Sequence, residues 1–87
     1  MGDVHDETVA AARQVADRLQ QRGHADQAHA VRAVLGRGFA GALLLEGLRD
    51  VCQVVLTAIE AIDPVSATMV EELRLGVDSR LKRGPAA

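Results

Sequence analysis

The segment from residue 39 to residue 62 constrains the fold most, because it reads as one helix with apolar residues around most of its circumference. On a helix that turns by about 100° per residue, its polar side chains fall within an arc of about 100°. These side chains are Glu46, Arg49, Asp50, Gln53, Thr57 and Glu60. A helix that is apolar on most sides is normally buried in a core, a subunit interface or a membrane. The rest of an 87-residue chain can cover only part of this helix, which predicts assembly with a partner.

Two further helices are predicted before this segment. Residues 4–22 carry an apolar stripe at helical spacing. Asp3 precedes it as a suitable N-cap, and Gly23 follows where a residue tolerant of positive φ ends a helix well. Residues 25–35 form a shorter helix that ends at a Gly-Arg-Gly turn. Connections this short make consecutive helices neighbours in space, antiparallel or sharply angled.

A fourth helix is predicted over residues 64–82. Asp63 and Pro64 mark its start, because aspartate suits the N-cap and proline suits the first helical position. The sequence therefore predicts an all-α fold, a four-helix antiparallel bundle of three long helices and one short helix around the central hydrophobic third helix. We expect a single domain over residues 1–87, with residues 84–87 as a disordered tail.

Composition narrows the class of partner. The formal net charge is −2 with acids and bases interspersed, so the chain lacks the basic patch that non-specific nucleic-acid binding requires. One Phe and no Trp or Tyr leave few rings to stack on a base or a flavin. We therefore expect no cofactor of this kind and no nucleic-acid partner.

The same composition bears on location. The lone Cys52 excludes an intramolecular disulfide, and the acidic N-terminus lacks the basic and apolar regions of a signal peptide. The uncharged runs are shorter than the ~20 residues that cross a bilayer, so no membrane association is expected. These features predict a soluble, cytoplasmic protein, and the Ala-, Arg-, Val- and Leu-rich composition is typical of bacteria.

Carboxylates on the third helix make a metal-dependent enzyme or ligand-binding bundle an alternative function. Glu46 and Asp50 lie one helical turn apart, and Glu60 lies near the end of the same helix. Bundle enzymes hold divalent metals with such carboxylates, but their ligands converge from several helices. Glu71-Glu72 is the only further acidic cluster in the second half of the chain. Because the third-helix acids share one polar arc, we interpret them as a solvated face and predict no metal ligand.

A helix-turn-helix DNA-binding regulator is the second alternative. Residues 25–35 and 39–62 would form the motif, with Arg32 near its turn. The recognition helix would then be the most apolar element of the chain and would present acidic Glu46 and Asp50. A major-groove helix needs Arg, Lys, Asn or Gln toward the base edges, so this pattern argues against DNA binding.

Histidine, cysteine and serine residues give no catalytic constellation. His24 and His29 are about 140° apart on a helix, so they do not share one face. Cys52 lies on the apolar side of the third helix, where a thiol packs as a small hydrophobic group. Ser66 has no nucleophile motif around it. We therefore predict that the protein is not an enzyme.

The apolar arc of the third helix divides into two rows. Leu44, Leu48, Val51, Val55 and Ile62 form a seam expected to meet the first and fourth helices of the same chain. The predicted interface with a partner subunit consists of Leu45, Cys52, Leu56 and Ile59, together with Leu75, which lies opposite the main apolar face of the fourth helix. Two-fold symmetry is the commonest way to cover such a surface. The sequence thus predicts a non-catalytic homodimer that binds a protein partner or a small apolar ligand.

Overall fold

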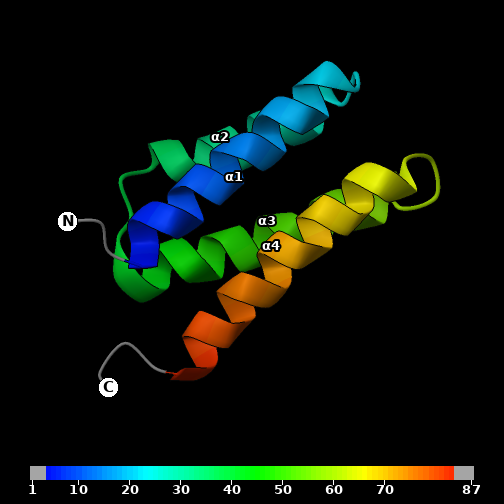
Figure 1. Ribbon diagram of the computed structural model, residues 1–87. Coiled ribbons are helices and arrows are strands. Elements are labelled where there is room, and N and C mark those ends of the chain that lie inside the picture. Colours follow the sequence, from blue (N-terminus) through cyan, green and yellow to red (C-terminus); the bar gives the residue numbers. More distant parts are fainter. Residues whose placement is uncertain (1–3, 84–87) are drawn as a thin grey trace.

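The computed structural model contains the four predicted helices and describes residues 4–83, with side chains for residues 7–82. The helices are α1 (Val4–Gln21), α2 (Ala25–Gly36), α3 (Gly41–Ile59) and α4 (Pro64–Arg83) (Figure 1). Their lengths of 18, 12, 19 and 20 residues confirm three long helices and one short helix. The predicted N-cap Asp3 and the predicted tail at residues 84–87 lie outside the described residues.

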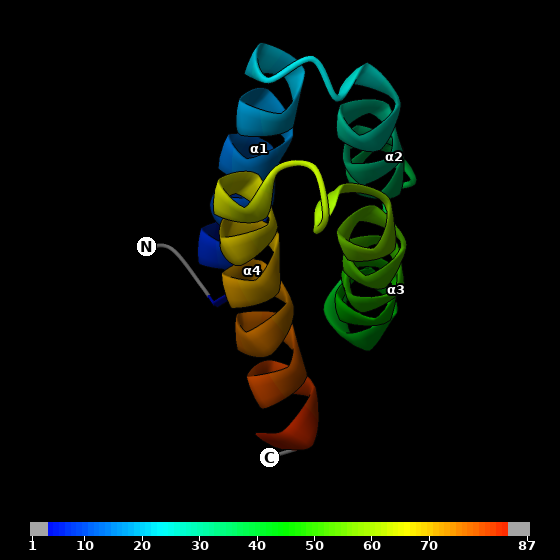
Figure 2. The same cartoon turned by 90° about the vertical axis from the view of Figure 1, so that its right-hand side faces the viewer.

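The helices form two antiparallel hairpins that pack on each other. One hairpin is α1 with α2 and the other is α3 with α4, and the main contacts between hairpins join α1 to α4 and α2 to α3. Figures 1 and 2 show the turns of both hairpins at the same end of the bundle. Each helix therefore has two main neighbours, and α3 forms one side of the bundle and does not occupy its centre.

The end of α1 follows the predicted glycine signal. The Gly23 N–H donates to the Gln20 carbonyl at 3.1 Å, and the His24 N–H donates to the Leu19 carbonyl at 2.8 Å. This pair of bonds is the Schellman motif, which requires the residue after the helix to have positive φ. Gly23 has φ of 84°, which glycine adopts without strain. These bonds pair the carbonyls of Leu19 and Gln20 as the chain reverses into α2.

Helix α3 is shorter than predicted at both ends. The helix begins at Gly41, which has a positive φ of 60° and follows the extended residue Ala40. It ends at Ile59, whose carbonyl accepts hydrogen bonds from the N–H groups of both Ile62 and Asp63. These bonds tighten the chain into a turn, and Ile62 is 71% exposed rather than part of the predicted seam.

Gly47 explains how α3 approaches α2. A Cβ atom built on this residue would lie 3.1 Å from Val34 Cγ1, which is closer than ordinary van der Waals contact. The glycine therefore lets Val34 pack close to the backbone of α3, and this contact compensates for the low helix propensity of glycine.

The core lies along the bundle axis and is almost entirely aliphatic. Leu19, Leu48, Ile59, Val31, Val55, Val70 and Val77 are the largest apolar side chains with less than 2% exposure. They come from all four helices, as the helical spacing of apolar residues predicts. The polar arc of α3 is also confirmed, because its side chains are exposed except for the half-buried Arg49.

Candidate functional site

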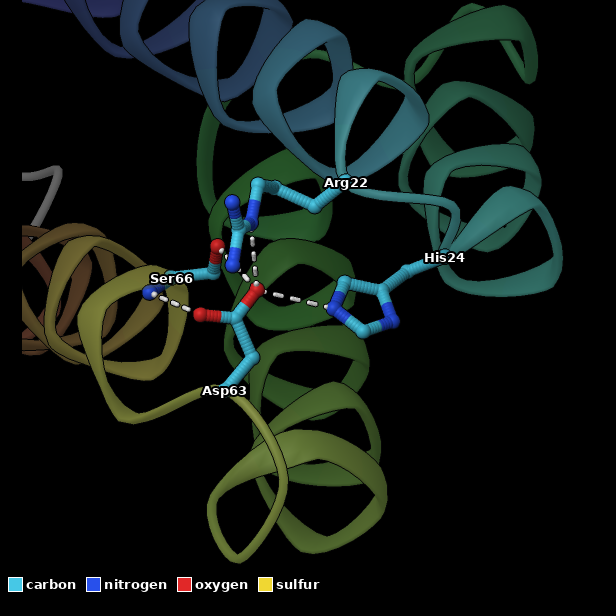
Figure 3. Close-up of polar contacts among 4 residues, drawn as sticks. All are labelled: Arg22, His24, Asp63 and Ser66. Atoms are coloured by element: carbon cyan, nitrogen blue, oxygen red, sulfur yellow. Dashed lines mark hydrogen bonds and ion pairs between the residues drawn. The ribbon is translucent and has the colours of Figure 1, made fainter.

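A polar cluster joins the turns of the two hairpins (Figure 3). We call this cluster of Arg22, His24, Asp63 and Ser66 the joint. Asp63 is the predicted N-cap of α4: its Oδ1 accepts a hydrogen bond from the Ser66 backbone N–H at 3.2 Å. Its Oδ2 accepts a second bond from the Ser66 hydroxyl at 2.7 Å. The capping interaction therefore fixes the carboxylate at the start of α4.

Two side chains from the turn between α1 and α2 complete the joint. His24 Nε2 lies 2.9 Å from Asp63 Oδ2, and Arg22 Nε donates to the same oxygen at 3.3 Å. Because an ionised carboxylate can only accept, the Nε2 of His24 carries the proton in this contact. The Asp63 and His24 side chains are 5% and 14% exposed, whereas that of Arg22 is 53% exposed. A buried carboxylate thus connects the two hairpins.

The hydrogen bonds at the joint hold Asp63 in its charged form. The Ser66 hydroxyl has the largest effect in lowering the pKa of Asp63 well below its ordinary range, followed by the His24 ring and the Ser66 backbone N–H. Burial raises the pKa, and Arg22 contributes a smaller lowering. Bonds to the ionised carboxylate therefore outweigh the cost of removing it from water.

The geometry of the joint suits fixing the fold better than catalysing a reaction. Serine nucleophiles need a base that accepts the hydroxyl proton and exposure to a substrate. Ser66 is 1% exposed, and its hydroxyl donates to a carboxylate whose lowered pKa makes it a poor proton acceptor. The cluster therefore resembles a catalytic set in composition only.

Cys52 is also placed for packing. It is fully buried, and burial raises the pKa of its thiol to about 12, although nearby Arg74 opposes the rise. The thiolate is the reactive form, so the native thiol is expected to react slowly. We predict that iodoacetamide alkylates Cys52 in the folded protein at least ~100-fold more slowly than in the denatured chain. Mass spectrometry of timed samples checks this, and comparable rates would contradict the buried position.

The carboxylates considered as metal ligands lie at two separate places on the surface. Glu46 and Asp50 lie on the exposed strip of α3, where Arg49 Nε is 3.6 Å from Asp50 Oδ1. Glu60 instead borders α4 and lies near Glu71 and Glu72. Among the described residues, no group of three or more His, Cys, Asp or Glu side chains is arranged to hold a metal ion.

The apolar sides of α2 and α3, the two helices considered for DNA binding, are buried in the core. Seven residues of α3 are buried: Leu44, Leu45, Leu48, Val51, Cys52, Val55 and Ile59. The exposed strip of α3 keeps Glu46 and Asp50, which repel a phosphate backbone. The structure therefore leaves the acidic side of this helix as the side that a nucleic acid could approach.

The predicted interface row on α3 needs a correction. Leu45 is 5% exposed, and Cys52 and Ile59 are fully buried, because α3 packs against both α2 and α4 of its own chain. These three side chains therefore belong to the core of one chain. Leu56 is half-buried and Leu75 is 53% exposed, so they are the predicted interface residues that a second protein could reach.

Both accessible residues line surface depressions beside α4. The first depression, which we call the α3–α4 groove, is lined by Leu56, Glu60, Pro64, Ala67, Thr68, Glu71 and Glu72. The second, the α4 hollow, is lined by Leu75, Asp78, Ser79 and Lys82. The two follow one another along α4 and combine apolar with charged side chains, the mixture that protein interfaces use.

Charges in these depressions differ in whether they are paired. Arg74 Nη2 lies 2.5 Å from Glu71 Oε2, and Arg74 Nη1 lies 2.8 Å from Asp78 Oδ2. The pKa of Glu71 is lowered mainly by this hydrogen bond from Arg74. Within residues 7–82, by contrast, Glu60, Glu72 and Lys82 form no ion pair. The groove therefore carries unpaired negative charge and the hollow unpaired positive charge.

Comparisons with known proteins leave the site to be judged on its geometry. No family model, curated protein or solved structure matches the chain. Over residues 4–83, no helix is both long and apolar enough to cross a membrane.

Sequence reasoning named most of these residues but did not bring them together. It identified Asp63 as a cap and Glu60 with Glu71-Glu72 as acids, yet neither group has a local signal for its distant partners. His24 and Asp63 are 39 residues apart. The usable signal is topological, because two hairpins side by side can place both of their turns at one end of the bundle.

Proposed function

We propose that this protein is a non-catalytic protein–protein interaction module that works as a homodimer. The observation that carries the proposal is the side of α4 formed by the α3–α4 groove and the α4 hollow. Leu56 and Leu75 are accessible there, beside Glu60, Glu72 and Lys82, which form no ion pair within residues 7–82. Unpaired charges around accessible apolar side chains provide both contact area and electrostatic specificity for another protein.

The depressions favour a protein partner over a small apolar ligand. Both are open to solvent and lined by several polar or charged side chains. Small apolar ligands bind in enclosed, mainly apolar cavities that bury most of their surface. A neighbouring helix fits a groove between two helices better, because its side chains can enter at helical spacing.

The oligomeric state tests this proposal. We expect native mass spectrometry and analytical ultracentrifugation of the full chain to show a dimer at high micromolar concentration that dissociates on dilution. A shared surface of this limited apolar content supports a reversible rather than an obligate dimer. A protein that stays monomeric at high micromolar concentration by both methods would overturn the proposed function.

A further inference from the structure

We propose that a second copy of the chain occupies the α3–α4 groove and the α4 hollow, with the two α4 helices antiparallel across a two-fold axis near Gly76. The inference rests on the proposed homodimer and adds the surface and the orientation. In a two-fold interface, the same patch on each copy must be complementary to itself. The α3–α4 groove and the α4 hollow meet this condition.

One exposed face of α4 has the spacing that helix pairing needs. Thr68, Glu72, Leu75, Ser79 and Lys82 follow alternating steps of four and three residues, and all five are exposed. This is the repeat by which residues line one seam of a helix packed at a shallow angle. Leu75 lies at the middle of the series and supplies its apolar contact.

Gly76 lies beside this seam at the level of the proposed axis, where it also lines a depression between α1 and α4. It lies in the interior of α4, where glycine lowers helix propensity. A Cβ atom built on it would meet no atom within 4 Å, so packing inside the chain does not require glycine there. The absence of a side chain beside the seam leaves room for side chains of a second α4 that crosses at this level.

The charges determine the orientation. Relative to Gly76, the acids Glu72 and Glu60 lie toward the start of α4, and the base Lys82 lies six residues beyond it. Antiparallel pairing brings Lys82 of each copy to the stretch between Thr68 and Glu72 of the other, beside the groove. Parallel pairing would place like charges together, which is destabilising. Lys82 of each copy thus lies near the acids Glu60 and Glu72 of the other.

Charge reversal across the axis tests the arrangement. Lys82→Glu and Glu72→Lys are each expected to weaken the dimer about tenfold by analytical ultracentrifugation, because the symmetric interface loses each contact twice. The double variant restores opposite charges and is expected to return the dissociation constant to within about threefold of the original. These positions are exposed, so the variants should keep their helical circular dichroism.

A third variant and two controls complete the experiment. Gly76→Gln should retain a folded monomer, because glutamine favours helix, but it should weaken the dimer at least about tenfold by placing a bulky side chain beside the seam. Glu46→Lys and Val54→Glu change exposed residues of α3 that line neither depression, and they should leave the dimer unchanged.

The possible outcomes distinguish failure of the proposed interface from failure of the proposed function. A dimer that withstands both single charge reversals and Gly76→Gln would refute the antiparallel α4 arrangement while leaving the homodimer in place. Weakening without rescue in the double variant would also reject the proposed charge pairing. A wild-type chain that is monomeric at high concentration overturns the homodimer itself.

Discussion

Replacing Ile59 with alanine is expected to lower the free energy of unfolding by about 2–5 kcal/mol, as found for large buried aliphatic side chains. Ile59 is fully buried at the end of α3, within a core that all four helices share. The substitution removes apolar contact and leaves a cavity that a close-packed interior fills only in part. Urea denaturation followed by circular dichroism measures the loss.

The controls for Ile59 test whether its own chain alone buries this side chain. Val54→Ala changes a side chain that is 66% exposed on the same helix, so its effect should stay within about 0.5 kcal/mol. Ile59→Val, expected to cost about 0.5–1.5 kcal/mol, covers the case in which alanine prevents folding. The difference between Ile59→Val and wild type should be the same at every protein concentration. A difference that appears only when the protein is associated would mean that a partner covers Ile59.

Replacing Asp63 with alanine is expected to lower the melting temperature by about 5–10 °C at neutral pH. The change removes the N-cap of α4 and leaves the buried Ser66 hydroxyl and the His24 ring without their acceptor. Unsatisfied buried donors are more costly than the mean value of a hydrogen bond suggests. Thermal denaturation by circular dichroism measures the shift, with exposed Asp50→Ala as a control that should change little.

The same carboxylate makes stability depend on acidic pH. Folding lowers the pKa of Asp63, so its charged form favours the folded state whenever the pH lies above the unfolded value of about 4. This contribution decreases as the pH falls below that value and through the lower pKa of the folded state. The gap in melting temperature between wild type and Asp63→Ala should therefore be widest near neutral pH and narrow in acid. A gap that does not change between pH 7 and pH 3 would contradict the lowered pKa.

Local sequence signals predicted the helices well. Gly23 ends α1 in the expected conformation, and Asp63 with Pro64 begins α4 as predicted. These signals succeed because a cap or a positive φ depends on a few neighbouring residues. The exposed polar strip of α3 followed from helical periodicity for a similar reason.

The partners of each apolar row could not be predicted in the same way. Periodicity shows which side of α3 avoids water, but it does not distinguish coverage by α2 and α4 from coverage by a second chain. The row containing Leu45, Cys52 and Ile59 was therefore assigned to a subunit interface, although the chain itself buries all three. The joint was missed because its contacts depend on how two hairpins align, which no local pattern encodes.

The joint also couples the lengths of two turns that are far apart in the sequence. Arg22 and Asp63 are 41 residues apart, yet their contact requires both turns to hold these two residues in one relative position. One extra residue in either turn would have to be accommodated without carrying Asp63 or His24 away from its partner. Insertions and deletions that loops usually tolerate are therefore restricted at both turns together. The connection between α2 and α3, at the opposite end of the bundle, has no such constraint from the joint (Figure 1).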